Sequence, residues 1–199
     1  MPQAFIFIGR SGCGKDTQIS LLSDFLKQKS DTPILLIEEG ESFRKFFAEE
    51  GYPNKLSKAI YESGDRQPDF LACFMWTRTI LSHYNGREHL IFNGTPRSLP
   101  EAKIVETALR FFHFEKPIIV HLDVSRGWSR KHLISRKRYD DLDVSKIEKR
   151  LDWFDRDVLP AIDFFKSNPF FSFHEINGEQ TIETVQRSII VSLEPPPSR

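Results

Sequence analysis

Short hydrophobic segments alternate with longer stretches of helical periodicity along the chain. Apolar runs predict five β-strands, at 4–8, 34–37, 90–92, 118–122 and 170–176. The second to fourth runs are continuously apolar, which is typical of strands buried on both faces of a sheet. Between the runs, Ile19, Leu22 and Leu26 share one face of a helix, and Ser98 with Glu101 forms a capping box that opens another. Strands separated by helices predict a three-layer α/β fold, with a five-stranded parallel sheet and helices on both faces.

Two intervals between these strands are longer than a simple helical crossover requires. Residues 39–88 contain two or three short helical patterns, and residues 125–168 contain two, with a basic and acidic turn between them. Such intervals predict insertions on one core, because most connections in compact domains are short. The 199 residues are therefore expected to form a single domain over 1–193, followed by a disordered proline-rich tail over 194–199.

The composition is that of an ordinary globular protein, with 39% hydrophobic and 28% charged residues. Basic and acidic residues both number 28, and this zero net charge argues against a protein that coats nucleic acid. The first residues lack the features of a signal peptide, and no apolar run approaches the ~20 residues that span a membrane. Since Cys13 and Cys73 cannot build a disulfide scaffold, we expect a cytoplasmic protein. The small size and zero net charge are compatible with a monomer, and we expect no nucleic-acid or membrane partner.

A glycine-rich segment with the features of a phosphate-binding loop follows the first predicted strand. It reads Gly9-Arg10-Ser11-Gly12-Cys13-Gly14-Lys15-Asp16-Thr17, and a helical pattern begins directly after it. Such a turn directs backbone N–H groups at phosphate oxygens, the start of the helix adds partial positive charge, and Lys15 reaches the terminal phosphates. The hydroxyl comes one position later than in the common G-x-x-x-x-G-K-[ST] pattern, at Thr17. A chance glycine-rich turn is the weaker interpretation, because strand, glycines, lysine and helix follow in the required order.

Seven segments in the same order resemble motifs of the adenylate kinase, or nucleoside monophosphate kinase, family. GRSGCGKDTQ resembles the family's loop GxPGxGKGTQ, GESFR at 40–44 resembles GDLLR, and GDRQPDF at 64–70 resembles GKLVPDE. FNGTPRS at 92–98 is similar to DGFPRT, and RYDD at 138–141 with KRL at 149–151 is similar to the family's R-x-DD…KRL pair. INGEQTIETV at 176–185 resembles the last strand, turn and helix. The resemblance covers residues 4 to about 190.

The resemblance implies a P-loop kinase that uses Mg²⁺ and ATP and reversibly phosphorylates AMP, giving two ADP. It also implies an insertion at about 39–70 that binds the nucleoside monophosphate, and a lid at about 131–145. This lid is expected to be short and without structural zinc, because residues 135–143 leave no room for a four-cysteine site. The positions that the resemblance assigns to ATP are Gly9, Ser11, Gly12, Cys13, Gly14, Lys15, Asp16, Thr17, His132 and Gln180.

Several arginines match family positions that surround phosphates. By resemblance, Arg44 and Arg97 hold the acceptor phosphate, and Arg136, Arg138 and Arg150 surround the transferred group together with Lys15. Arginine suits this task because its planar fork binds phosphate oxygens in pairs and stays charged. The acceptor positions that the resemblance assigns are Glu39, Gly40, Phe43, Arg44, Gln67, Gly94, Arg97, Glu101, Arg138 and Arg150. The catalytic group comprises Lys15, Arg97, Arg136, Arg138 and Arg150.

Two departures from the family pattern concern the metal ion. The acid of DGFPR is replaced by Asn93, and a glycine of the loop is replaced by Asp16. An amide is a weaker partner for a hydrated cation than a carboxylate. We therefore hypothesise that Asp16 compensates, so that Mg²⁺ is held through water by Asp16, Thr17 and Asn93 with no direct protein ligand. The alternative is that Asp16 only favours the helix N-terminus.

Further departures concern the base of the acceptor. The family's glutamine is Glu101, its threonine is Glu39 and its valine is Gln67. An ionised carboxylate only accepts hydrogen bonds, so it matches guanine or cytosine donors better than adenine N1. AMP remains the leading acceptor, with GMP, CMP or UMP as alternatives. Glu101 also fits a capping role, and a nucleotide-binding regulatory module with little kinase activity stays open as a rival.

Overall fold

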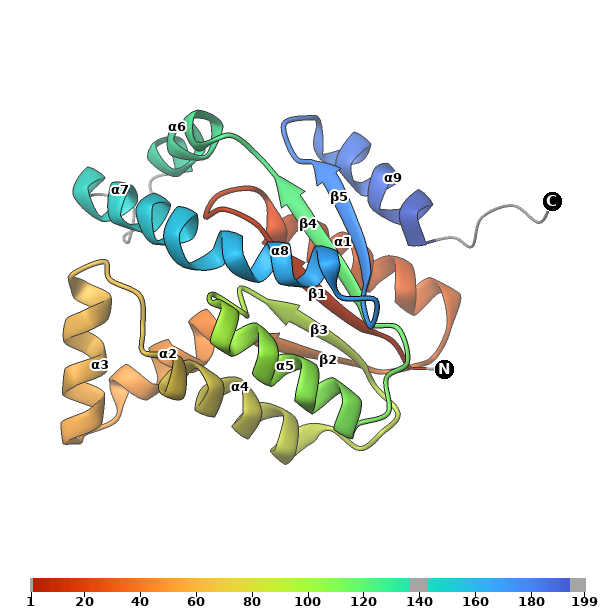
Figure 1. Cartoon of the computed structure of the whole chain (residues 1–199), viewed down its shortest axis with the longest axis horizontal. Coiled ribbons are helices and arrows are strands. Elements are labelled where there is room, and N and C mark those ends of the chain that lie inside the picture. The colour runs from red at the N-terminus through yellow and green to blue at the C-terminus, as the bar shows by residue number, and fades with distance from the viewer. Residues whose placement is uncertain (1, 137–142, 194–199) are drawn as a thin grey trace.

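The computed structural model describes residues 2–136 and 143–193. Its centre is a sheet of five parallel strands in the order β2-β3-β1-β4-β5 (Figure 1). The strands are β1 (Ala4–Ile8), β2 (Ile34–Glu38), β3 (His89–Asn93), β4 (Ile118–Asp123) and β5 (Ser172–Asn177). This confirms the predicted α/β class and the parallel sheet.

Helices cover both faces of the sheet and give three layers. They are α1 (Lys15–Lys29), α2 (Glu39–Ala48), α3 (Tyr52–Glu62), α4 (Asp69–His83), α5 (Leu99–Phe111), α6 (Arg126–Arg136), α7 (Val144–Trp153), a π-helical turn η2 (Phe154–Val158), α8 (Leu159–Ser167) and α9 (Ile182–Leu193). Two buried clusters follow from the alternation of side chains along β1. Phe5 and Phe7 face α1 and α9, whereas Ile6 and Ile8 face α4, α5 and α8.

Two of the predicted strands differ in detail from the structure. β2 is an edge strand and leaves Leu36 36% exposed, because only β3 lies beside it. β5 begins at Ser172, and the preceding Phe171 stays buried in a turn rather than in the strand. The first turn of α7 is capped by the Asp143 carboxylate, which accepts from the Ser145 N–H at 2.9 Å.

The two long intervals lie on either side of the edge to which the strands point. Figure 1 shows α2 and α3 on one side and α6 and α7 on the other. Leu133, Ile147 and Leu151, all fully buried, join α6 to α7 in a small cluster of their own. That these segments act as acceptor insertion and lid stays a prediction.

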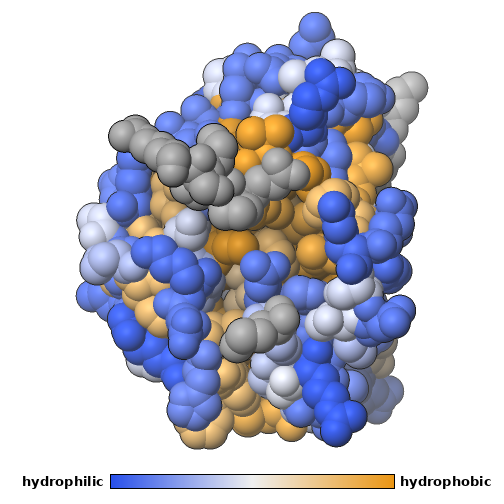
Figure 2. Space-filling model, turned by 90° about the vertical axis from the view of Figure 1, so that its right-hand side faces the viewer, coloured by the Kyte–Doolittle hydropathy of each residue, from blue (hydrophilic) through white to orange (hydrophobic). Residues whose placement is uncertain are grey.

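The opposite end of the molecule carries the starting ends of the strands. Figure 2 shows hydrophobic residues gathered mainly across the middle of this face, with hydrophilic residues mostly around its rim. Among the described residues, no helix is both long and apolar enough to cross a bilayer.

Candidate active site

The loop after β1 has a conformation that only glycines permit at its key positions. Gly12 and Gly14 have φ of 81° and 92°, in the left-handed region that L side chains avoid. A Cβ at Gly9 would lie 2.5 Å from the carbonyl oxygen of Leu122 in β4. The loop therefore passes close to the sheet, and α1 begins at Lys15 with its free N–H groups beside the loop. This is the geometry of an anion site at a helix N-terminus.

Lys15 folds back over this loop. Its Nζ donates to the carbonyl oxygens of Gly9 at 2.7 Å and Arg10 at 3.0 Å. The buried Cys13 thiol lies 3.5 Å from the same Nζ and does not line the cleft described below. The ammonium group is thus held at the mouth of the loop, where a phosphate can replace the two carbonyl contacts.

Arg10 ties the loop to β4 and η2, a role that no motif indicated. Its Nε donates to the carbonyl oxygen of Val124 at 3.1 Å, and its Nη1 forms an ion pair with Asp155. Its guanidinium lies 4.5 Å from the ring centroid of Phe154. Asp155 also accepts from Arg126 of α6 at 3.1 Å, so loop, α6 and η2 share one charged network.

A cleft of about 480 Å³ opens beside the loop. Its lysine and arginine side chains come from five separate segments: Lys15, Arg44, Arg97, Arg136 and Arg150. Gly9, Ser11, Gly12, Gly14, Asp16, Thr17, Gly40, Phe43, Gln67, Gly94 and His132 also line it, as the family motifs implied. Arg138 lies outside the described residues. Positive groups gathered from such distant parts of the chain favour a bound polyanion.

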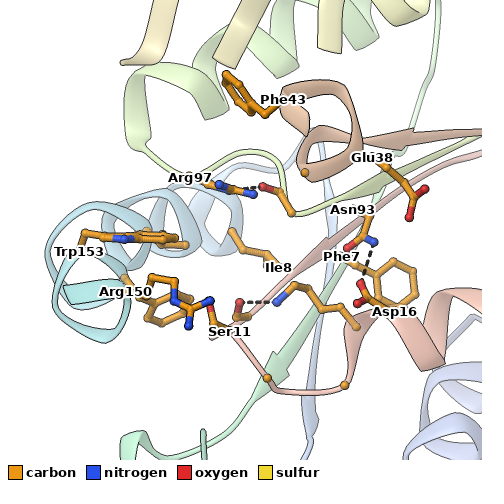
Figure 3. A pocket seen from close by; sticks show the side chains of 18 of the residues that line it. Phe7, Ile8, Ser11, Asp16, Glu38, Phe43, Asn93, Arg97, Arg150 and Trp153 are labelled. Atoms are coloured by element: carbon orange, nitrogen blue, oxygen red, sulfur yellow. Dashed lines mark hydrogen bonds between the residues drawn. The ribbon is translucent and has the colours of Figure 1, made fainter. Parts of the chain in front are cut away.

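The two sides of the cleft differ in charge. Figure 3 shows Arg97 and Arg150 on one side, and Asp16, Asn93 and Glu38 on the other. The amide of Asn93 donates to the Asp16 carboxylate at 2.9 Å, so the two departures from the family pattern are in direct contact. Burial and the neighbouring Glu41 raise the pKa of the Glu38 carboxyl.

Arg97 is oriented by groups behind the cleft wall. Its Nε donates to the carbonyl oxygen of Gly94 at 2.7 Å and lies 3.0 Å from Oε2 of Glu39. Its guanidinium lies 5.9 Å from the ring centroid of Trp153. Arg44 lies over Gly40, where a Cβ would be 3.5 Å from its Nη1. Arg44 therefore reaches the cleft from α2, and Arg97 reaches it from the loop between β3 and α5.

The structure does not place Glu39 and Glu101 in the cleft. Their residues are 1% and 0% exposed, and neither lines it. Glu101 accepts from the backbone N–H of Arg97 at 2.6 Å, and its own N–H donates to the Ser98 hydroxyl at 3.2 Å. Burial, followed by the charge of Glu39, raises the pKa of Glu101 to about 8, and burial also raises the pKa of Glu39. Contact of either carboxylate with a base in the cleft is therefore not part of this arrangement.

Gln67 lines the cleft but its amide is engaged in the protein. It exchanges two hydrogen bonds with Ser57 of α3: Ser57 Oγ donates to it at 2.7 Å, and it donates to the Ser57 carbonyl at 2.8 Å. On the donor side, His132 stacks on Trp128 with ring centroids 3.5 Å apart. Gln180 is exposed and does not line the cleft.

Residues to which the sequence assigned no role also line the cleft: Glu38, Glu41, Tyr61, Asp65, Ser135, Trp153 and Phe154. They lie beside motif residues in the chain, but their types carry no signal of their own. Among the described residues, no group of three or more histidine, cysteine, aspartate or glutamate side chains is arranged to hold a metal ion directly.

The chain is similar over nearly its whole length to adenylate kinases. It is 27% identical to the adenylate kinase of Flavobacterium psychrophilum over 188 residues, which cover 92% of this chain and 94% of that protein. It is 29% identical to the adenylate kinase of Leptospira biflexa, with 94% and 98% covered, and 27% identical to adenylate kinase 1 of Nostoc sp., with 94% and 97% covered. No model of a known protein family matches the chain. With the loop, the sheet order and the arginine-lined cleft, these relatives support membership of the chain in the adenylate kinase family and indicate a phosphotransferase.

Proposed function

We propose that this nucleoside monophosphate kinase takes AMP as acceptor and transfers to it, reversibly, the γ-phosphoryl group of ATP. The observation that carries the proposal is the convergence of Lys15, Arg44, Arg97, Arg136 and Arg150 on one cleft. Phosphoryl transfer depends mainly on positioning and on stabilising charge on the transferred group. Two bound polyanions with a shared gap between them require cations from both sides, which this cleft supplies.

Each cation has a place in the reaction. Lys15 leaves the carbonyls of Gly9 and Arg10 and binds the terminal phosphates of the donor, which the glycine-rich loop holds through its N–H groups. Arg44 and Arg97 hold the phosphate of the acceptor. Arg136 and Arg150 approach from α6 and α7 and stabilise the transferred group. No general base is needed, because the attacking phosphate is already an anion.

The residues around Asp16 fit a hydrated magnesium ion. Asp16, Thr17 and Asn93 present a carboxylate, a hydroxyl and an amide at the cleft, and Mg²⁺ prefers oxygen ligands and keeps several of its waters. When bound with the nucleotide, Mg²⁺ neutralises charge on the phosphate oxygens. Asp16 supplies the carboxylate that Asn93 lacks, and Asn93 orients it through its 2.9 Å hydrogen bond.

AMP is favoured as the acceptor because the residues that suggested another base do not offer their side chains to a base in the cleft. Glu39 and Glu101 suggested a guanine or cytosine acceptor, but both carboxyls are buried away from the cleft. Gln67, the third departure, has its amide engaged by Ser57. The relatives are named adenylate kinases, and this name also supports AMP as the acceptor.

The test is a comparison of four acceptors. Formation of ADP from Mg-ATP is followed with AMP, GMP, CMP or UMP, and with ATP alone to detect hydrolysis. We expect the highest kcat/KM with AMP and little hydrolysis in its absence. Faster turnover with another monophosphate refutes AMP as the acceptor. Binding of ATP without turnover of any of the four would show a regulatory module instead.

A further inference from the structure

A hydroxyl group lies between two buried carboxyl groups behind Arg97. The Oγ1 of Thr95 is 3.0 Å from Oε2 of Glu39 and 3.3 Å from Oε1 of Glu101. The three residues come from α2, the loop after β3 and α5, and each is at most 1% exposed. Water therefore does not solvate either carboxyl group.

The number of hydrogens at this point limits the charge of the pair. A threonine hydroxyl donates one hydrogen, so it can serve only one of two ionised carboxylates. If Glu101 carries a proton on Oε1, it donates to Thr95, and Thr95 donates to Glu39. Both contacts are then hydrogen bonds, whereas two ionised groups would leave one contact repulsive.

Burial acts in the same direction. Oε1 of Glu39 is buried and has no hydrogen-bond partner in the described part of the chain, which makes a second charge on the pair costly. Two like charges on either side of one hydroxyl group repel each other and oppose ionisation of both carboxyl groups, and the pKa of each carboxyl is raised accordingly.

We propose that Glu39 and Glu101 share one proton through Thr95, and that the single remaining negative charge positions Arg97 for the phosphate of the acceptor. Glu39 and Glu101 are positioning residues, since neither lines the cleft. The inference rests on the proposed acceptor role of Arg97. One carboxylate balances the guanidinium through Nε, which lies 3.0 Å from Oε2 of Glu39. Within the described residues neither Nη atom of Arg97 donates a hydrogen bond, so that both remain for phosphate oxygens.

Loss of the shared proton would change this balance. Two negative charges would then face one guanidinium, drawing it back from the cleft and lowering its attraction for phosphate. The other groups near the pair do not titrate between pH 7 and pH 9.5. Arg66 has its pKa raised, Asp69 has its pKa lowered, and burial raises the pKa of Cys73 to about 12.

The first experiment measures kcat and the KM for AMP from pH 7 to pH 9.5 at saturating Mg-ATP. We expect KM to rise above about pH 8, by at most about tenfold per pH unit, with kcat little changed. Glu101→Gln cannot ionise, so its KM should stay constant over this range. Glu39→Gln removes the like charge, and its rise in KM should move to lower pH. Glu115→Gln, at an exposed loop position, should behave as the wild type.

A second measurement needs no turnover, and its first part uses the wild type alone. With glutamate labelled at Cδ with ¹³C, the wild type should show a carboxyl resonance that titrates above pH 7. Thr95→Val removes the bridging hydroxyl and should shift this midpoint.

The outcomes separate the two claims. If no monophosphate is phosphorylated, the proposed function fails while the resonance still tests the shared proton. A flat KM in an active wild type, a rise that survives in Glu101→Gln, or no carboxyl titration above pH 7 overturns the inference.

Discussion

The carboxyl of Glu101 should make the stability of this protein fall with rising pH. Burial and Glu39 raise its pKa from 4.5 to about 8 in the folded protein. The folded state therefore holds this proton more tightly than the unfolded state. The stabilisation is complete below pH 4.5, and it is lost as the pH rises through about 8.

The size of the effect follows from the two pKa values. The difference between 4.5 and about 8 corresponds to about 5 kcal/mol over the whole range, as an upper limit because Glu39 competes for the proton. Between pH 7 and pH 8.5 the loss is about 1 kcal/mol. His89, His121 and His174 do not account for a loss in this window, because their lowered pKa values leave them neutral in the folded protein above pH 7.

Urea unfolding at pH 7 and pH 8.5 measures the loss directly. The wild type should lose about 1 kcal/mol of unfolding free energy across the window, and Glu101→Gln should lose clearly less. Glu115→Gln, which is exposed, serves as the matched control and should follow the wild type. A wild type whose stability is constant or rises, or a Glu101→Gln variant with the same loss, would refute the reasoning.

Three further predictions concern the loop, the metal site and the core. Lys15→Met should lower kcat/KM by about 100-fold or more, because the main cation of the loop is removed; Lys27→Met, exposed on the same helix, should not, and near-normal turnover of Lys15→Met would contradict the role given to Lys15. Asp16→Gly should need a higher Mg²⁺ concentration for half-maximal activity and should bind Mg²⁺ more weakly in a calorimetric titration in the presence of nucleotide. An unchanged Mg²⁺ requirement would show that Asp16 serves only the helix N-terminus. Leu151→Ala should cost about 2–5 kcal/mol of unfolding free energy, since Leu151 is fully buried between α6 and α7, and a loss below about 1 kcal/mol would show that this cluster is not close-packed.

Much of the fold can be predicted from local features of the sequence. The apolar run ending at Ile8, the glycines after it and Lys15 specify a strand, a tight turn and a helix by their own conformational preferences. The motif positions of Arg44 and Arg97 likewise follow from short segments, and both lie at the cleft. Such features need only neighbouring residues, so no knowledge of the rest of the chain is required.

Other features depend on which distant segments pack together. Glu101 has the same sequence context whether it faces a base or the interior, and only the packing of α2 against the loop after β3 decided that it pairs with Glu39 through Thr95. The contact of Arg10 with Asp155 joins residues 145 positions apart, which no local pattern reports. The sequence by itself determined the strands, the phosphate loop and the cations. Only the tertiary structure decided the charge and burial around them, because the free energy of a carboxyl group depends on the solvent and partners that folding leaves to it.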